Sequence, residues 1–297
     1  MLKASYNVHN LIRRTFGQVP GGMFGADENA RMGSIDPRQG VETCGLVEQM
    51  ASDELMLCMT GDPLWAEHCE EVAFNSYPAA VMPDFKGLRY ITCPNQTVSD
   101  SKNHHPGIDN RGPFLAMNPF SSRCCQHNHA QGWPYYAEHL ILATPDNGVA
   151  AAMYAACKAT VKVGDGNEIS LHEQTNYPFE ETIRFTVNTP KAVSFPFYLR
   201  IPSWTEGATI FVNGKKVAAN PEAGQYACIN REWKDNDQVE IQLPMQLSMR
   251  TWQVNKNSVS VDYGPLTMSL KIDEDYVKKD SRATAIGDSK WQEGADA

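Results

Sequence analysis

The residues best suited to chemistry are an adjacent pair of cysteines, Cys124 and Cys125, and an upstream pair, Glu42 and Cys44. Adjacent cysteines close only a strained disulfide ring, and regular backbone points their side chains apart. Irregular backbone that brings such thiols together usually serves a soft metal ion. We therefore expect these four side chains to bind zinc. The alternative is a set of buried free cysteines, because the spacing matches no standard zinc finger.

Composition places the chain among ordinary globular proteins. It has 297 residues, 42% of them hydrophobic and 21% charged, a net charge of −9 and eight cysteines without a disulfide framework. The absence of a Lys/Arg-rich run argues against nucleic acid and anionic membranes as partners. No apolar run reaches the roughly 20 residues of a membrane span. No signal peptide is visible at Met1, and the sequence identifies neither a compartment nor an oligomeric state.

Helical periodicity dominates the first half of the chain. The Glu42–Cys44 cluster opens one predicted helix, while Asp62 followed by Pro63 is typical of an N-cap and first helical position. Helices are predicted over residues 2–16, about 41–58, from 63 onward, and about 124–143.

Alternating periodicity replaces the helical pattern from about residue 149. Ile183, Phe185 and Val187, for example, alternate with polar residues, as expected for half-buried strands. The Asn213-Gly214 pair is a strong hairpin signal. Turn signals recur every 8–15 residues, which predicts an antiparallel β-sandwich from 149 to about 271 that packs on the helical half.

Several motifs together resemble glycoside hydrolase family 127, the β-L-arabinofuranosidase-like family. The most specific is the combination of Glu42-Thr43-Cys44 with Cys124-Cys125, and the run from Gly21 to Glu28 also matches. Further segments resemble the family's β-domain, so the resemblance covers nearly the whole chain; they are 199–204 (LRIPSW), 212–214 (VNG), 231–233 (REW) and 263–266 (YGPL).

The resemblance implies a zinc-dependent retaining glycoside hydrolase that releases terminal β-L-arabinofuranose, or a related furanosyl residue, from plant-type glycans. It assigns the nucleophile to Cys124, with Glu42, Cys44 and Cys125 as further zinc ligands. Glu28 matches the acid/base, although the loop from it to Glu42 is shorter than the family pattern. The implied partner is a carbohydrate substrate and the implied cofactor is zinc.

The resemblance also suggests substrate contacts, each with a plain alternative. Glu70 matches a position that binds sugar hydroxyls, but it could be an exposed helix charge. Tyr90 is a candidate sugar platform or a core aromatic residue, and His127 is a candidate polar contact or an ordinary residue of a helix start. Ser122 stands where the family often has a histidine, which departs from the pattern at one expected substrate contact.

The implied domain organisation is a partial (α/α)6 barrel followed by a β-sandwich. Residues 1–148 would form the C-terminal half of the barrel, 149–272 the sandwich, and 273–297 a polar tail. A complete barrel of twelve helices needs more than roughly 200 residues, so we expect a truncated chain with little activity alone. The alternative function is a non-catalytic remnant, with a structural zinc and a β-sandwich that packs or binds glycan.

Overall fold

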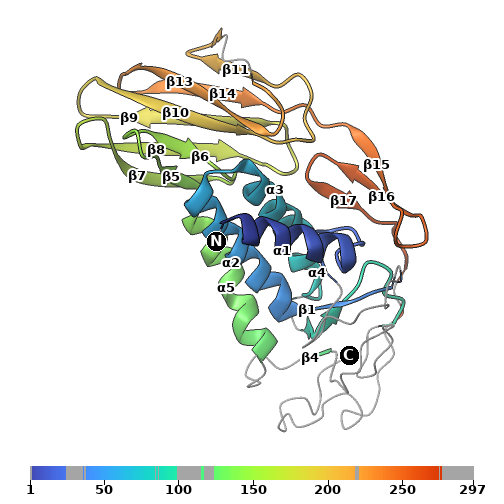
Figure 1. Ribbon diagram of the computed structural model, residues 1–297. Helices are drawn as coiled ribbons and strands as arrows, with labels where there is room; N and C mark the ends of the chain where they lie inside the picture. The colour runs from blue at the N-terminus through green and yellow to red at the C-terminus, as the bar shows by residue number, and fades with distance from the viewer. Residues whose placement is uncertain are drawn as a thin grey trace.

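The computed structural model describes residues 2–24, 36, 38–83, 85, 87–98, 115–116, 124–217, 221–273 and 275. Helices come first and strands follow (Figure 1), which confirms the predicted mixed architecture. The strands are antiparallel as predicted, except that residues 149–151 pair in parallel with 197–199. The helical part also contains two small sheets, β1–β3 and β2–β4. Its elements are α1 (Leu2–Thr15), β1 (Val41–Glu42), α2 (Thr43–Thr60), α3 (Pro63–Glu71), the π-helix η1 (Val72–Ser76), α4 (Tyr77–Ala79), β2 (Leu88–Arg89), β3 (Ile91–Thr92), β4 (Leu115–Ala116) and α5 (Cys124–Glu138).

Helix boundaries follow local chemistry in most places. α2 ends at Gly61, whose φ of 66° is favourable for a residue without a side chain. The Asp62 side chain accepts a hydrogen bond from the backbone N–H of Leu64, and Pro63 begins α3, as predicted. The fourth helix, however, stops at Glu138 rather than near 143. Residues 141–143 instead form β5, which pairs with β6 across a short turn.

The strands build two larger sheets and one smaller sheet. A four-stranded sheet has the order β13-β10-β6-β5, and a six-stranded sheet has the order β12-β11-β14-β9-β8-β7. The third sheet is β15-β16-β17. Their bounds are β5 (Ile141–Ala143), β6 (Val149–Ala151), β7 (Cys157–Val163), β8 (Asn167–Thr175), β9 (Thr182–Asn188), β10 (Val193–Ile201), β11 (Thr209–Val212), β12 (Lys215–Lys216), β13 (Gln225–Trp233), β14 (Asp237–Gln242), β15 (Leu247–Trp252), β16 (Ser258–Tyr263) and β17 (Leu266–Met268).

One hydrophobic core joins the two larger sheets. Phe197 and Trp233 from the four-stranded sheet and Phe185 from the six-stranded sheet are fully buried in the same cluster. The Phe185 and Phe197 rings meet edge-on with centroids 5.3 Å apart. Alternate residues of β9 and of most of β10 supply this core, as the period of two in the sequence predicted.

The predicted hairpin at Asn213-Gly214 is confirmed. Both residues have positive φ, 50° and 75°, as the tight turn between β11 and β12 requires. The Asn213 amide donates a hydrogen bond to Asp237, and its side-chain oxygen accepts one from the backbone N–H of Gln238. The turn is thereby fastened to the start of β14.

Glu71, at the end of α3, connects three elements of the fold. Its carboxylate contacts Arg13 of α1 at 3.3 Å and Arg250 of β15 at 2.7 Å. Burial alone would raise the pKa of Glu71, but these two guanidinium groups outweigh it and lower the pKa from 4.5 to about 2.

This depressed pKa predicts a specific acid sensitivity. The stabilisation from Glu71 is fully present above pH 4.5 and is lost as the pH falls toward 2, because the unfolded chain then takes up the proton first. We expect Glu71→Gln to cost roughly 2 kcal/mol of unfolding free energy at pH 7 and much less near pH 2.5. Urea unfolding at both pH values measures this. Glu48→Gln, which changes an exposed charge on α2, is the matched control, and an equal cost of Glu71→Gln at both pH values would contradict the prediction.

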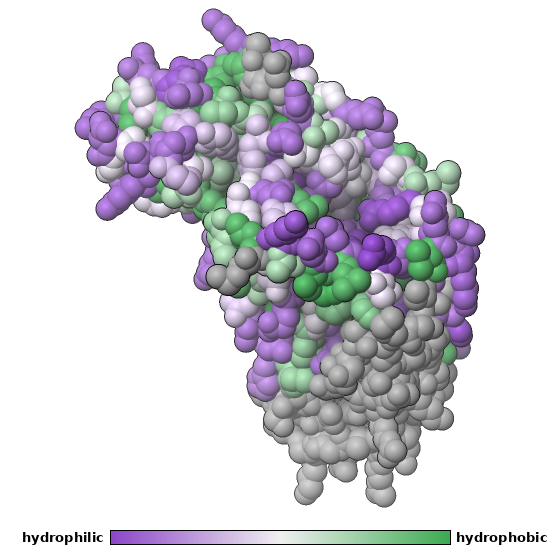
Figure 2. Space-filling view, in the orientation of Figure 1, coloured by the Kyte–Doolittle hydropathy of each residue, from purple (hydrophilic) through white to green (hydrophobic). Residues whose placement is uncertain are grey.

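Apolar side chains lie on the surface of α1, α2 and the β15-β16-β17 sheet. They include Val8 and Leu11 of α1, Leu55 and Met59 of α2, and Met249 of β15, which is 79% exposed. Figure 2 shows such green areas near α1 and near the three-stranded sheet. Within the described residues, no helix has the length and apolar character needed to cross a bilayer.

Candidate active site

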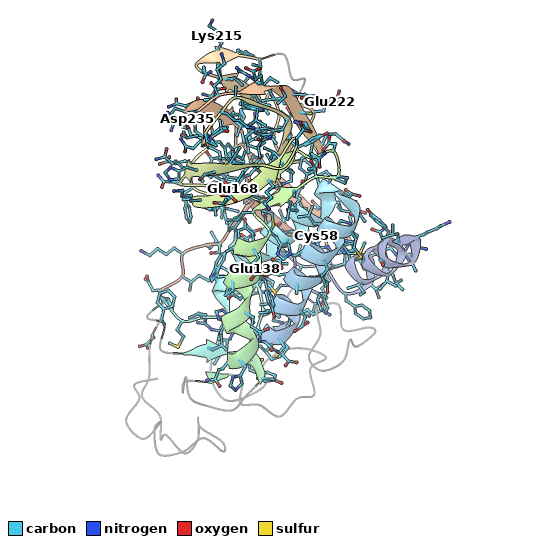
Figure 3. The ribbon with its side chains drawn as sticks, turned by 90° about the vertical axis from the view of Figure 1, so that its left-hand side faces the viewer. Cys58, Glu138, Glu168, Lys215, Glu222 and Asp235 are labelled. Atoms are coloured by element: carbon cyan, nitrogen blue, oxygen red, sulfur yellow. The ribbon has the colours of Figure 1, made fainter. Side chains whose placement is uncertain are left out.

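Helices α2 and α5 run side by side and begin at the same place. Figure 3 shows them beneath the strand layers, with Cys58 in the last turn of α2 and Glu138 at the end of α5. Cys44 is the second residue of α2, and Cys124 and Cys125 open α5. Because the N-terminus of a helix favours negative charge, two such termini stabilise thiolates at this point.

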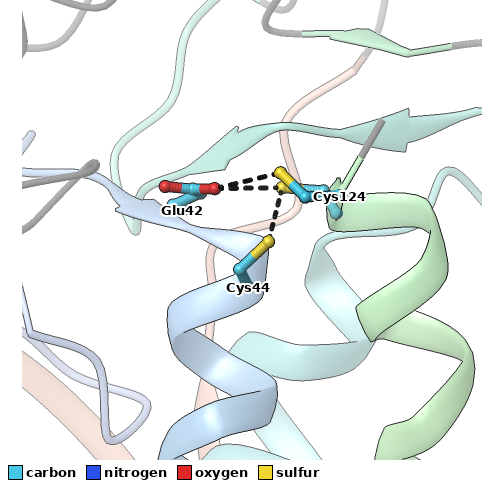
Figure 4. Close-up of side chains that lie close together, drawn as sticks. Glu42, Cys44 and Cys124 are labelled. Carbon is cyan, nitrogen blue, oxygen red and sulfur yellow. Dashed lines mark hydrogen bonds between the residues drawn. The ribbon is translucent and has the colours of Figure 1, made fainter. Parts of the chain in front are cut away.

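The sequence-predicted cluster is brought together (Figure 4). Potential ligand atoms of Glu42, Cys44, Cys124 and Cys125 all lie within 4.8 Å of one another. The sulfurs of Cys44 and Cys125 are 3.4 Å apart. One carboxylate oxygen of Glu42, Oε1, lies 3.6 Å from the sulfur of Cys124 and 3.5 Å from that of Cys125.

These donors fit a zinc ion. Zinc takes a tetrahedral set of sulfur, nitrogen and oxygen ligands, and Zn–S bonds of about 2.3 Å place two sulfurs about 3.7 Å apart. The sulfurs of Cys44 and Cys125, at 3.4 Å, are a few tenths of an ångström closer than this value. Four anionic donors around a dication leave a formal charge of −2, which the two helix termini help to support.

Without a cation, the acidic groups of the cluster oppose the ionisation of one another. A hydrogen bond from Cys125 lowers the pKa of Cys44, and the same contact raises the pKa of Cys125. Burial, together with the neighbouring Cys44, raises the pKa of Cys124. The donor set therefore calls for a bound metal ion if all three sulfurs are to be thiolates.

Two further side chains contact the sulfurs. The hydroxyl of Tyr90 is 3.9 Å from the sulfur of Cys124, and burial and the nearby Glu42 raise the pKa of this phenol, so it remains a neutral hydroxyl. The Asn128 side chain hydrogen-bonds to Cys44 and helps to lower its pKa. Sequence reasoning missed Asn128; the signal was its position one helical turn after Cys124.

The other predicted site residues have different placements. His127 is exposed on the first turn of α5, near Cys124 in the chain. Glu28 and Ser122 lie outside the described residues. Glu70 is fully buried, and its carboxylate contacts Arg200 at 2.5 Å and accepts a hydrogen bond from the Tyr177 hydroxyl at 2.8 Å. In this placement Glu70 is not available to a sugar, and it links α3 to the strand region instead.

Comparison with known proteins identifies the family. A family model described as the β-L-arabinofuranosidase, GH127 catalytic domain, matches residues 1–138, and the GH127 middle domain model matches residues 148–245. The chain belongs to glycoside hydrolase family 127. This confirms the resemblance predicted from the cysteine motifs. No curated protein matches this family 127 chain.

Solved structures agree with the family. One described as a glycoside hydrolase is 28% identical, with a TM-score of 0.65, and the match covers 77% of this chain and 37% of that one. A GH127 β-L-arabinofuranosidase from Geobacillus stearothermophilus T6 is 24% identical, with a TM-score of 0.73, covering 87% of this chain and 41% of that one. A GH127 β-arabinofuranosidase is 20% identical, with a TM-score of 0.69, covering 87% and 42%.

The two GH127 structures show that this chain shares their fold over the matched residues. The family 127 chain spans 37–42% of the length of these three structures.

Proposed function

We propose that this chain carries the catalytic cysteine and zinc site of a retaining glycoside hydrolase that acts on terminal β-L-arabinofuranosides or related furanosides. Family membership supports glycoside hydrolysis, and the clustered donors support a metal site. Zinc, when bound by Glu42, Cys44, Cys124 and Cys125, would keep the thiolates deprotonated and hold them in place.

The observation that carries the proposal is the unequal exposure of the three thiols. Cys125 is buried and Cys44 is partly buried, whereas Cys124 is exposed. A cysteine at the surface of the cluster can reach an anomeric carbon, which supports Cys124 as the proposed nucleophile.

In the first proposed step, the Cys124 thiolate attacks the anomeric carbon. A carbon–sulfur bond forms while the bond to the leaving oxygen breaks, and the protonated carboxyl group of Glu28 donates its proton to that oxygen. The assignment of Glu28 rests on its motif. Tyr90, which lies beside the Cys124 sulfur, and His127 are the proposed contacts for the sugar and its leaving group.

In the second step, the Glu28 carboxylate takes a proton from water. The water oxygen bonds to the anomeric carbon, and Cys124 leaves as a thiolate. Two inversions at the same carbon retain its configuration. This sequence regenerates both residues in their starting protonation states.

The architecture supports a matching domain proposal. We assign residues 1–148 to the C-terminal part of an (α/α)6 barrel and 149–272 to a β-sandwich, in which the four- and six-stranded sheets share one core. Residues 273–297 are the proposed polar tail. The chain spans less than half of the length of its structural relatives. The activity of the whole protein is therefore also part of this proposal.

The test is covalent labelling rather than turnover alone, because labelling identifies the residue that bonds to the sugar. An aryl β-L-arabinofuranoside with a good leaving group should add one pentosyl unit, which intact mass spectrometry detects and peptide mapping places on Cys124. Cys124→Ser should abolish this adduct. A Glu28→Gln variant should keep it but slow its hydrolysis, because no base then activates water.

Cys228→Ser is the matched control, since Cys228 is also an exposed free cysteine but lies on β13. It should label like the wild-type protein. An adduct on Cys228 or Cys44, or equal labelling of Cys124→Ser, would refute the assignment of the nucleophile.

A further inference from the structure

None of the residues of helix α1 is buried. Polar and ring contacts therefore hold this helix on the hairpin of α2 and α3. The Tyr6 hydroxyl donates a hydrogen bond to Asp62 at 2.7 Å and accepts one from the Trp65 indole at 3.3 Å. The His9 ring meets the rings of Trp65 and His68 edge-on, with centroids 4.8 and 4.9 Å away. This junction collects polar side chains from three helices.

At the junction, each of the three helices supplies one potential metal ligand. Ligand atoms of His9 from α1, Asp53 from α2 and His68 from α3 all lie within 4.8 Å of one another. Asp53 has no exposed surface, His68 is 6% exposed and His9 is partly buried. The set shares no residue with the cysteine cluster.

The hydrogen bonds at this junction leave one ring nitrogen without a partner. Nδ1 of His68 is 2.7 Å from one oxygen of Asp53, and the other oxygen accepts from Gln49 at 2.8 Å. Nε2 of His68 is buried and has no hydrogen-bond partner. The proton on Nδ1 therefore stands where a metal ion would meet both His68 and Asp53. With the ion bound there, the ring proton lies on Nε2.

We propose that His9, Asp53 and His68 form a second metal site, which takes a divalent first-row transition-metal ion. Imidazole and carboxylate donors suit zinc, cobalt or nickel better than calcium or magnesium. Two histidines and one carboxylate also form a well-attested three-ligand set that leaves positions open to water. The site goes beyond the proposed hydrolase function and does not depend on it.

The geometry asks for a small adjustment only. With bonds of about 2.0–2.2 Å, ligand atoms that share one ion lie at most about 4.4 Å apart. All separations at this site are within 4.8 Å, and an inward turn of the partly buried His9 brings its ring nitrogen into the bonding range. The ion replaces the proton between His68 and Asp53 and fastens α1 to the hairpin.

Cobalt titration separates the two sites by their spectra. Thiolate ligands give cobalt an intense near-ultraviolet charge-transfer band, whereas nitrogen and oxygen ligands give only weak visible bands. We expect the wild-type chain to bind about two cobalt ions, of which only one adds to the thiolate band. His9→Gln should weaken the second site by at least about 10-fold, the size of effect seen when metal-site partners are lost, and leave the thiolate band unchanged.

A second measurement follows α1 itself. The exposed Arg14 near the end of α1 is a trypsin site, and cobalt should slow its cleavage in the wild-type chain but not in His9→Gln. His172→Gln, which changes an exposed histidine on β8, is the control and should behave like wild type. Asp53→Asn, checked for folding by circular dichroism, should also lose the second ion.

Two results would overturn the proposal. One is equal uptake of cobalt by the wild-type chain and His9→Gln. The other is a wild-type chain that takes up only the ion responsible for the thiolate band. A wild-type chain that binds cobalt without any thiolate band, and loses that cobalt in His9→Gln, would instead support this site and count against the cysteine site.

Discussion

Cys125→Ser is expected to abolish zinc binding by the cysteine cluster. Cys125 is buried and lies 3.4 Å from the sulfur of Cys44 and 3.5 Å from the Glu42 carboxylate, so its thiolate is central to the donor set. Zinc held by such sets contributes apparent free energies of about 10–16 kcal/mol. A hydroxyl in place of a thiolate removes one anionic ligand, and the zinc content after dialysis should fall from about one ion to nearly none.

The measurement is elemental analysis of protein purified without chelator. A His9→Gln background restricts the count to the cysteine cluster. Cys93→Ser is the matched control, because Cys93 is another buried free cysteine outside the cluster, and it should keep the zinc. A chain that contains no zinc, and takes up none when zinc is added, would contradict the prediction.

The second large effect is expected at the buried ion pair between Glu70 and Arg200. Both side chains are fully buried, and Arg200 also donates a hydrogen bond to the carbonyl of Ala152. Arg200→Met would leave the Glu70 carboxylate in the interior without its cation. We expect a loss of about 3–5 kcal/mol in unfolding free energy, a large part of the stability of an ordinary domain.

A double variant separates the ion pair from simple packing. Replacing both charges, with Glu70→Leu and Arg200→Met, should recover part of the loss, since an apolar pair often substitutes for a buried ion pair at little cost. Arg184→Met is the matched control, because it breaks an exposed pair with Glu240 at 2.9 Å and should cost less than about 1 kcal/mol. Urea unfolding of all variants decides the question, and equal losses in Arg200→Met and Arg184→Met would show the buried pair to be unimportant.

Local sequence signals determined much of the fold and of the candidate site. Asp62 with Pro63 begins α3, and Asn213-Gly214 forms the hairpin, because these residues satisfy backbone groups within a few positions of themselves. The cysteine and glutamate motifs likewise predicted a cluster that the fold assembles. The helix start and the hairpin survive any tertiary arrangement, since their physical cause is short-range. The meeting of Cys44 with Cys125, by contrast, needs α2 and α5 to pack side by side.

Tertiary structure decided what depends on distant partners. The predicted helix over 124–143 ends at Glu138, because Ile141–Ala143 gain more from pairing with β6 than from another helical turn. The sequence motif suggested Glu70 as a substrate ligand, whereas in the fold its carboxylate pairs with Arg200, which lies far along the chain. The exposure of Cys124, the burial of Cys125 and the meeting of His9, Asp53 and His68 also arise only when separate helices pack, since periodicity shows which face is apolar but not which surface covers it.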